Sequence, residues 1–341
     1  MPRKTTQTND SKIPIHTKLP LISPYPTGSY LIYDYDQETV KRNQKTANKK
    51  AVKPRPLCPP PQQTHFREGT KIQLRASGSR QLDIDSLTKV LKTVATHVPN
   101  GTLHVIDLRQ ESHLFFDNRA VSWYADKDWS NVGQSPTWIR RDEEHRASIS
   151  RESTVQIFCV DPEAKTQGNI IPTGYSNVDV HLARSEEAAI KEIAAKTPLG
   201  CEVIYKRIPV SDHCPPTLDA ANDFLNLCRS RRPEDIWMHF HCHGGDGRTT
   251  TFLAMYDMVC WARSGRKLLS TEEFADRQLS LFCYDLMPPD SPCPRDGDWK
   301  CGLAKVRWIL LELWRNWLAS GGFASGKPFP YKKLMAKKLA V

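Results

Sequence analysis

The segment HCHGGDGRT, residues 241–249, lies between a short apolar run and a long helical pattern. The run Ile236–His241 predicts a buried strand, and Thr249–Arg263 predicts a helix. A turn between a strand and a helix N-terminus gathers backbone N–H groups and the positive helix dipole at one point. Glycine permits positive φ and close backbone approach, and the turn has three of them, Gly244, Gly245 and Gly247. The segment therefore predicts an anion-binding loop.

Two side chains in this loop have the spacing of a phosphoryl-transfer site. Cys242 opens the loop and Arg248 closes it, with five residues between them. The loop can then wrap one phosphoryl group, with the sulfur below it and a bidentate guanidinium beside it. The helix N-terminus and the arginine favour the thiolate, and the Thr249 hydroxyl is placed to hydrogen-bond the sulfur. This pattern indicates a cysteine nucleophile that needs no metal.

Two alternatives compete with this interpretation. A C-x5-R spacing alone arises by chance, although the preceding histidine, the glycines and the strand–loop–helix context argue against coincidence. A zinc site is conceivable because residues 239, 241 and 243 alternate onto one strand face. Its ligands would be His239, His241, Cys242 and His243, but the usual second ligand pair is missing.

A thiolate displacement also needs a proton donor for the leaving oxygen, and Asp212 is the best candidate. It lies in a predicted loop after the strand 202–208 and before Pro215-Pro216. Loops at the carboxyl ends of neighbouring strands reach the same crevice, so Asp212 is predicted to be the general acid. The competing interpretation is a capping aspartate before the helix that begins at Leu218.

Composition and charge describe a soluble globular chain with an unusual start. The 341 residues are 39% hydrophobic and 25% charged, and no apolar run approaches the roughly 18 residues of a membrane helix. Residues 1–62 hold 10 of the 25 prolines and a net charge of +7 out of +10. We therefore expect a disordered basic leader at 1–62, acting as an address outside the site, and a folded domain at 63–341. Because that domain is nearly charge-balanced, no nucleic-acid partner is expected.

The remaining pattern predicts an α/β fold. Short apolar runs alternate with amphipathic stretches after residue 100. Residues 115–182 contain short alternating stretches and read as a β-rich insertion. The cysteines form no CxxC pair and are expected to be mostly reduced. The predicted strands are 103–108, 153–160, 177–182, 202–208 and 236–241, and the predicted helices are 84–97, 186–196, 218–228, 249–263 and 305–318.

Several segments together resemble the protein-tyrosine-phosphatase-like inositol polyphosphatases, or cysteine phytases. The loop resembles their HCxxGxGRT motif, and DLRQESH at 107–113 resembles a family signature. The matches run in family order from about residue 65 to 310. The other matching segments are Phe66-Arg67, ASGSRQ at 76–81, AVSWY at 120–124, DWSNVG at 128–133 and Tyr205–Pro216.

The resemblance implies a cysteine-phosphatase fold, with a central, mostly parallel sheet flanked by helices and a small partial β-barrel inserted. It implies no cofactor, Cys242 as nucleophile, Arg248 as phosphate ligand and Asp212 as general acid. His241 would support the loop. The residues implied to bind substrate phosphates are His243, Gly244, Gly245, Asp246, Gly247, His213, Arg67, Lys300, Lys305 and Arg307. His243 and Asp246 depart from the usual family residues, which bears on substrate preference.

The expected function is hydrolysis of inositol hexakisphosphate and lower inositol phosphates. A phosphotyrosine or dual-specificity protein phosphatase is the alternative, and a binding module without turnover is a third possibility. No apolar segment follows the basic start, so a cleavable secretory signal is not expected. The polar N-terminus resembles that of bacterial effectors. We therefore expect an intracellular protein, delivered without a signal peptide into the cytoplasm or nucleus of a host cell.

Overall fold

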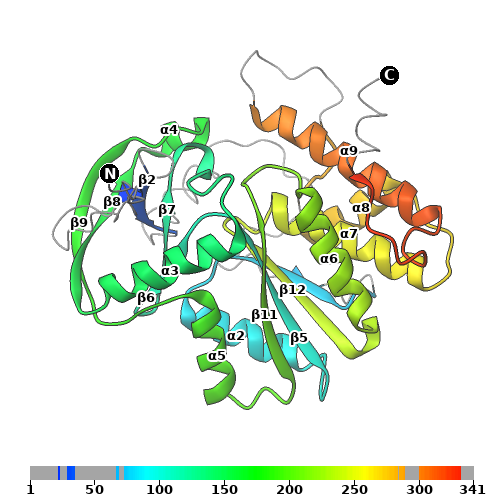
Figure 1. Cartoon of the computed structure of the whole chain (residues 1–341), viewed down its shortest axis with the longest axis horizontal. Coiled ribbons are helices and arrows are strands. Elements are labelled where there is room, and N and C mark those ends of the chain that lie inside the picture. The colour runs from blue at the N-terminus through cyan, green and yellow to red at the C-terminus, as the bar shows by residue number, and fades with distance from the viewer. Residues whose placement is uncertain are drawn as a thin grey trace, which may run out of the picture.

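A computed structural model describes residues 22–23, 29–34, 67–68, 73–282, 284–288 and 299–331. Its centre is a five-stranded sheet in the order β11-β5-β12-β4-β3 (Figure 1). The first four strands are parallel, and β3 pairs antiparallel with β4. The carboxyl ends of β5, β12 and β11 therefore meet at one edge of the sheet. The strands are β3 (Arg67–Glu68), β4 (Ala76–Arg80), β5 (Thr102–Arg109), β11 (Glu202–Val210) and β12 (Ile236–Cys242).

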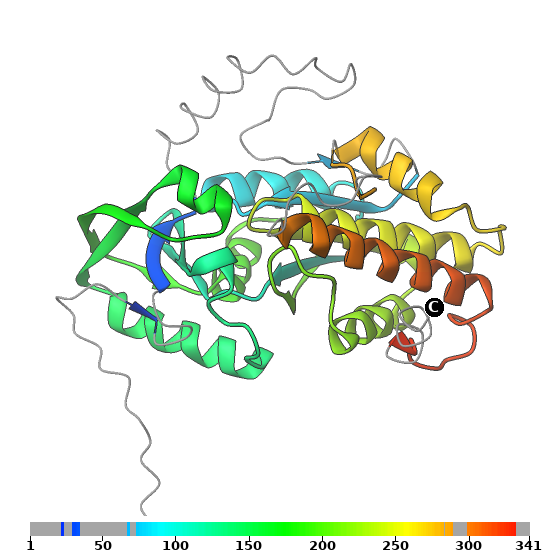
Figure 2. The same ribbon diagram turned by 90° about the horizontal axis from the view of Figure 1, so that it is seen from above.

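Helices cover both faces of this sheet, and strand alternation decides which side chains meet them. Leu103 and Val105 of β5 pack with α2 and α5, whereas Ile106 and Leu108 pack with α6, α7 and α9. Helix α7 contacts both α8 and α9 and lies between them (Figure 2). The helices are α2 (Ile84–Ala95), α5 (Glu186–Lys196), α6 (Leu218–Ser230), α7 (Gly247–Arg263), α8 (Thr271–Phe282) and α9 (Trp299–Ala319).

The predicted β-rich insertion is a mixed α/β unit. One antiparallel sheet has the order β1-β2-β7-β6-β10, and β8 and β9 form a separate ribbon. The expected partial barrel is not confirmed, and the insertion contains a 15-residue helix, α3, that the sequence did not predict. The elements are β1 (Ile22–Ser23), β2 (Ser29–Tyr33), β6 (His113–Phe116), β7 (Arg119–Tyr124), α3 (Pro136–Ser150), β8 (Ser153–Val160), α4 (Pro162–Gln167), β9 (Pro172–Val180) and β10 (Ala183–Arg184).

The N-terminal segment departs from the expected leader. Strand β2 pairs with β7 from Tyr30 opposite Tyr124 to Tyr33 opposite Val121, and Leu31 is buried in the core of the insertion. The expectation of disorder throughout 1–62 is therefore wrong for Ser29–Asp34. Its apolar run Tyr30–Tyr33 has a partner strand that lies about ninety residues away in the sequence. The rest of 1–62, apart from β1, lies outside the described residues.

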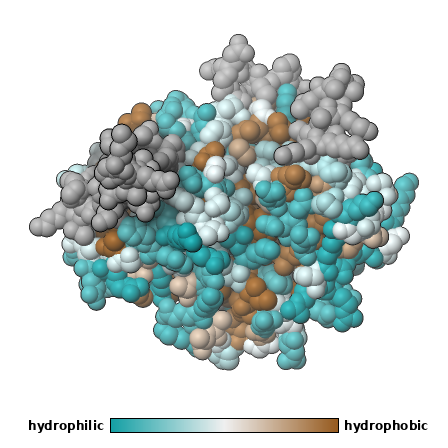
Figure 3. Space-filling model, in the orientation of Figure 1, coloured by the Kyte–Doolittle hydropathy of each residue, from teal (hydrophilic) through white to brown (hydrophobic). Residues whose placement is uncertain are grey.

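The surface and the cysteines agree with a folded globular chain. Hydrophilic residues dominate the face in Figure 3, where hydrophobic residues form separate patches. Within the described part of the chain, no helix is both long and apolar enough to span a bilayer. Cys301 takes part in a disulfide, an exception to the expected reduced thiols. The cysteines described as free are Cys159, Cys201, Cys214, Cys228, Cys242 and Cys260.

Candidate active site

The loop 241–249 connects β12 to α7 as predicted, and β4 packs against it. Gly245 has φ +76°, and a Cβ there would lie 2.6 Å from the backbone nitrogen of Arg80. The amide of Gln81 donates to the carbonyl of His243 at 3.2 Å. A Cβ on Gly247 would lie 2.7 Å from Nη1 of Arg307. The backbone of β4 therefore requires a glycine at 245, whereas a side chain at 247 would have to displace the end of Arg307, and Gly244 has room around it.

The Cys242 sulfur accepts two hydrogen bonds inside this loop. The amide of Gly245 donates to Sγ at 3.2 Å, and the Thr249 hydroxyl donates at 3.1 Å. The side chain is buried and lies just before the N-terminus of α7. Two hydrogen-bond donors and the N-terminal end of a helix therefore converge on this sulfur.

The guanidinium of Arg248 pairs with the buried carboxylate of Glu111. Its Nη1 lies 2.8 Å from Oε2 of Glu111, and its Nη2 lies 3.1 Å from Oε1. Nη1 also donates to the carbonyl of Val210 at 3.1 Å. This bidentate pairing fixes the plane of the guanidinium. Glu111 lies within the DLRQESH segment, but the sequence alone assigned it no role.

Asp212 lies beside Arg248 at the end of β11. Its Oδ1 is 3.1 Å from Nη2 of Arg248, and its Oδ2 is 3.1 Å from Nε2 of His213. Burial raises the pKa of Asp212, but Arg248 and His213 outweigh this and hold it well below its usual range. Trp129 donates to the Asp212 carbonyl at 3.0 Å. The structure thus brings the predicted acid and the loop together.

A third carboxyl group, that of Asp128, faces the same pair. It is fully buried, and its Oδ2 is 3.8 Å from Nη2 of Arg248. Burial and the neighbouring carboxylates of Glu111 and Asp212 raise the pKa of Asp128 well above its usual range. The Asp128 carboxyl group therefore holds its proton more tightly than an ordinary aspartate, beside the ion pair of Arg248 and Asp212.

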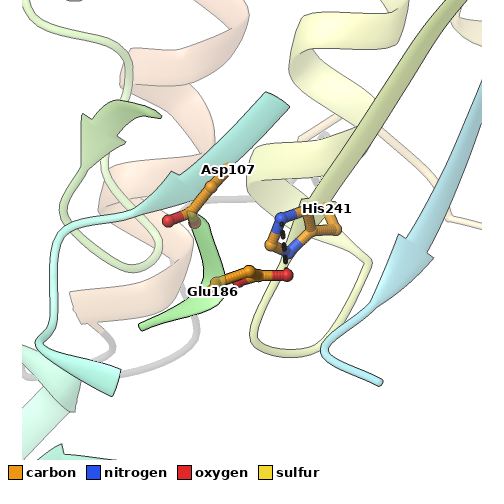
Figure 4. Close-up of side chains that lie close together, drawn as sticks. All are labelled: Asp107, Glu186 and His241. Carbon is orange, nitrogen blue, oxygen red and sulfur yellow. Dashed lines mark ion pairs between the residues drawn. The ribbon is translucent and has the colours of Figure 1, made fainter. Parts of the chain in front are cut away.

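His241 belongs to a buried polar group on the face of β12 opposite to Cys242. Its Nε2 is 3.4 Å from Oε1 of Glu186, and Asp107 completes the group (Figure 4). These ligand atoms lie within 4.8 Å of one another, as in a metal site. Asp107 already accepts from Tyr205 at 2.8 Å, however, and Glu186 from His113 at 2.9 Å. Because protein donors occupy the carboxylates, the group fits a support for β12 better than a cation site.

The alternative zinc ligands are not gathered together. His239 contacts the hydroxyls of Ser77 and Ser79 at 2.9 and 3.3 Å. Its ring stacks on that of His241 with centroids 6.4 Å apart. His243 leaves the strand and lies against Tyr124, with ring centroids 5.7 Å apart. The sequence-based zinc hypothesis therefore finds no support in this geometry.

The predicted phosphate ligands on α9 lie on different faces of the helix. Arg307 donates to the carbonyl of His213 at 3.0 Å and to the hydroxyl of Tyr284 at 2.8 Å, and it also lies against the loop. Lys300, two turns earlier on the same helix face, lies 5.4 Å from the ring of Trp299, which contacts His213. Lys305 is rotated by about 140° from Lys300 around the helix, away from that face.

The other predicted ligands differ in how well they are placed. The backbone of Arg67 in β3 pairs with that of Gly78 in β4, but the Arg67 side chain lies outside the described atoms. His213 adopts φ 61° and packs edge-on against Trp299, with ring centroids 4.9 Å apart. The carbonyl of Asp246 accepts from the amide of Thr250 at 2.8 Å, which starts α7.

Two lysines that the sequence did not point to border the site. The Lys165 ammonium lies 4.2 Å from the ring centroid of Tyr124, which in turn contacts His243. Burial lowers the pKa of Lys165, and the carboxylates of Asp128 and Asp34 partly offset this. Lys127 lies 4.9 Å from Trp129 and 5.5 Å from Trp299. Both come from the insertion, and no local pattern reveals that it folds over the loop.

Comparisons with known proteins find relatives of this chain. Residues 106–260 match the family model of PTP-like phytases, whose description reads inositol hexakisphosphate. The effector protein hopD2 of Pseudomonas syringae pv. tomato is 27% identical over 58% of this chain and 39% of its own length. Paladin from Xenopus tropicalis is 36% identical, but over only 17% of this chain and 7% of its own length. The chain thus spans well under half of these relatives.

Solved structures show the same fold. A PTP-like phytase from Bdellovibrio bacteriovorus has a TM-score of 0.61 at 26% identity, covering 91% of this chain and 98% of its own. The tandemly repeated phytase of Mitsuokella multacida also scores 0.61 at 26% identity, covering 72% and 38%. The PTP-like myo-inositol phosphatase from M. multacida scores 0.65 at 22% identity, covering 88% and 54%. We conclude that residues 106–260 of this chain match the PTP-like phytase family and that its fold is that of solved PTP-like phytases.

Proposed function

We propose that this protein is a metal-independent phosphatase that hydrolyses phosphomonoesters of inositol polyphosphates through a phosphocysteine intermediate. The observation that carries the proposal is one cluster at the N-terminus of α7. The loop there bonds to the sulfur of Cys242, and Arg248, at the end of the same loop, pairs with Asp212. A module that only captured its ligand would need the cations and the loop, but not a nucleophile and an acid in register. The family match and the solved relatives support the reaction class.

The first step transfers the phosphoryl group to sulfur. The Cys242 thiolate attacks phosphorus, and the bond from phosphorus to the ester oxygen breaks. Asp212 gives its proton to that oxygen, which leaves as the inositol hydroxyl. Loop amides and Arg248 bind the equatorial oxygens, where charge gathers in the transition state.

The second step returns the enzyme to its starting state. Water attacks the phosphocysteine while the Asp212 carboxylate takes a proton from it. The phosphorus–sulfur bond breaks, and orthophosphate and the Cys242 thiolate are released. Asp212 is then protonated again and ready for the next ester.

The resting ion pair explains how the acid becomes protonated. Without substrate, Asp212 is paired with Arg248 and its pKa is low. A bound phosphate pairs with the Arg248 guanidinium in place of Asp212 and adds negative charge nearby. Both changes raise the pKa of Asp212. Substrate binding therefore prepares the acid that the chemistry needs.

The surroundings of the loop favour a substrate with several phosphates over a phosphotyrosine. A phosphotyrosine site must accept a flat apolar ring beside the single phosphate. Here lysine ammonium groups lie against the aromatic rings near the loop instead. Lys165 lies over Tyr124, and Lys127 lies near Trp129. Arg307 adds a further charge on the α9 side. The similar myo-inositol phosphatase of M. multacida was solved in complex with myo-inositol-(1,3,4,5)-tetrakisphosphate, which supports the same substrate class.

Replacing Lys165 tests this substrate class. In Lys165→Met, the KM for inositol hexakisphosphate is expected to rise about 10-fold or more, because one charge-assisted contact to a peripheral phosphate is lost. The kinetics of an aryl monophosphate should change far less. Lys191→Met removes an exposed lysine that pairs with Glu187, and it serves as the control. Equal losses on both substrates would contradict the assignment of Lys165 to peripheral phosphates.

Chelation tests the metal-independent mechanism. No step above needs a divalent ion, so orthophosphate release from inositol hexakisphosphate is expected to continue in excess EDTA at its original rate. The measurement is phosphate release by dialysed protein with and without chelator. Loss of activity in EDTA, restored by zinc, would instead make the group of Asp107, Glu186 and His241 a cation site.

The place of action is also a proposal. We propose delivery into a host cell, because a relative over 58% of this chain is named an effector. The basic stretch Lys41–Arg55 would act as part of the address, and it lies outside the described residues. Fusion of residues 1–28 or 1–62 to a reporter, followed by a translocation assay, tests whether the leader directs export.

A further inference from the structure

Strand β2 places a carboxylate from the N-terminal segment beneath the phosphate-binding loop. Asp34 follows the last paired residue of β2, and its amide donates to the carbonyl of Ala120 at 3.1 Å. This backbone bond continues the pairing with β7 and turns the Asp34 side chain toward the loop. The side chain is fully buried.

Asp34 contacts both the loop and the arginine behind it. Its Oδ2 lies 2.8 Å from Nη1 of Arg109, and the hydroxyl of Ser122 donates to its Oδ1. Nε2 of His243 lies 3.6 Å from Oδ1. Burial raises the pKa of Asp34, but Arg109 outweighs this and lowers it to about 2, so the group is ionised at neutral pH. Burial lowers the pKa of His243 to about 3, which leaves its imidazole neutral.

Four charges of alternating sign connect this strand to the predicted phosphate ligand. Asp34 binds Arg109, and Nε of Arg109 lies 2.6 Å from Oε1 of Glu111. Oε2 of Glu111 lies 2.8 Å from Nη1 of Arg248. All four side chains are completely buried. In such a row each inner charge is shared between two partners, so its position depends on both.

We propose that Asp34 is a positioning residue for Arg248 and acts through Arg109 and Glu111. Without the Asp34 charge, the Arg109 guanidinium would have Glu111 as its main carboxylate partner and would pull it away from Arg248. Arg248 would then lose the plane that it needs to bind the equatorial oxygens of the transition state. The inference rests on the proposed phosphoryl transfer but not on the identity of the natural substrate. It also makes this part of the expected leader a component of the site.

The test uses Asp34→Asn with p-nitrophenyl phosphate, which reports phosphoryl transfer whatever the natural substrate is. The expected result is a fall in kcat of about 10- to 100-fold, with a smaller change in KM. The inhibition constant of orthovanadate, which resembles the transition state, should rise by a similar factor. Asp34→Glu keeps the charge and should retain more activity than Asp34→Asn.

A matched control separates positioning from general stability. Asp257 is also a buried aspartate, and it lies nine residues beyond Arg248 on α7. Its carboxylate accepts two hydrogen bonds from Arg277, at 2.9 and 3.0 Å. Asp257→Asn should lower the thermal midpoint while leaving kcat and vanadate inhibition at wild-type values. Folded Asp34→Asn protein with wild-type kcat and vanadate inhibition would overturn the proposal, and so would losses that Asp257→Asn matches.

A second variant covers the case in which Asp34→Asn does not fold. Arg109→Lys keeps the positive charge but loses the fork that joins Asp34 to Glu111. It should reproduce the fall in kcat and the weaker vanadate inhibition. An Arg109→Lys enzyme with unchanged kcat would contradict the proposed connection. A wild-type enzyme inactive on inositol hexakisphosphate but active on p-nitrophenyl phosphate would refute only the proposed substrate.

Discussion

Replacing Cys242 by serine is expected to leave the fold intact and to abolish turnover. A hydroxyl is far less acidic than a thiol, so the Gly245 amide and the Thr249 hydroxyl that favour a thiolate do not produce an alkoxide near neutral pH. Side-chain volume changes little, so the thermal midpoint should stay close to wild type. The measurement is orthophosphate release from inositol hexakisphosphate together with thermal unfolding.

A second cysteine on the same helix provides the control. Cys260 lies near the C-terminal end of α7, where burial raises the pKa of its thiol to about 12. Cys260→Ser should therefore retain full kcat. A Cys242→Ser enzyme with more than a trace of wild-type activity would exclude the covalent mechanism.

Asp212→Asn is expected to slow hydrolysis of inositol phosphates on the order of 10²- to 10⁴-fold. An amide cannot protonate a poor leaving group such as an inositol oxygen. The p-nitrophenolate of p-nitrophenyl phosphate leaves without a proton, so the rate of the phosphorylation step with this substrate should fall much less. The comparison requires kcat/KM for both substrates in the variant and in the wild type. Equal losses would remove Asp212 from the role of general acid.

The pH profile of the enzyme tests the same assignment independently. Asp212 acts as an acid only when protonated, and its pKa in the resting enzyme lies below the usual range. Its protonated fraction therefore grows as pH falls, and kcat/KM for inositol hexakisphosphate should rise from pH 7 toward pH 5. Asp212→Asn should lack this rise on the same substrate. A profile unchanged by the substitution would mean that another group supplies the proton.

Local sequence patterns predicted the loop and the sheet because both depend on neighbouring residues. The strand Ile236–Cys242 is an apolar run that ends in a glycine-rich turn, and helix Glu186–Lys196 matches its predicted limits. Helix α3 was missed because its buried face is mainly polar, with Asp142, Glu143 and Arg146 packed inward. Strand β4, ASGSR, was missed because small polar residues are buried there.

The rest of the site depends on contacts between distant segments. Asp34 reaches Arg109 across 75 residues, and Arg248 reaches Glu111 across 137. Lys165 belongs to the six-residue helix α4, and the position of that helix depends on how the insertion packs against the rest of the domain. Spacing along the chain carries no information about such contacts. The sequence could therefore propose the nucleophile and the acid, but not the groups that contact them.

The most direct test of the covalent mechanism is rapid-quench peptide mapping of the wild-type enzyme during turnover. Inositol hexakisphosphate is mixed with the protein in EDTA, and the quenched peptides are analysed by mass spectrometry. The mechanism predicts a transient phosphoryl group on the peptide that contains Cys242, followed by orthophosphate. Phosphate release without that adduct would contradict the covalent mechanism, and an adduct formed from a phosphotyrosine peptide but not from inositol hexakisphosphate would contradict the proposed substrate.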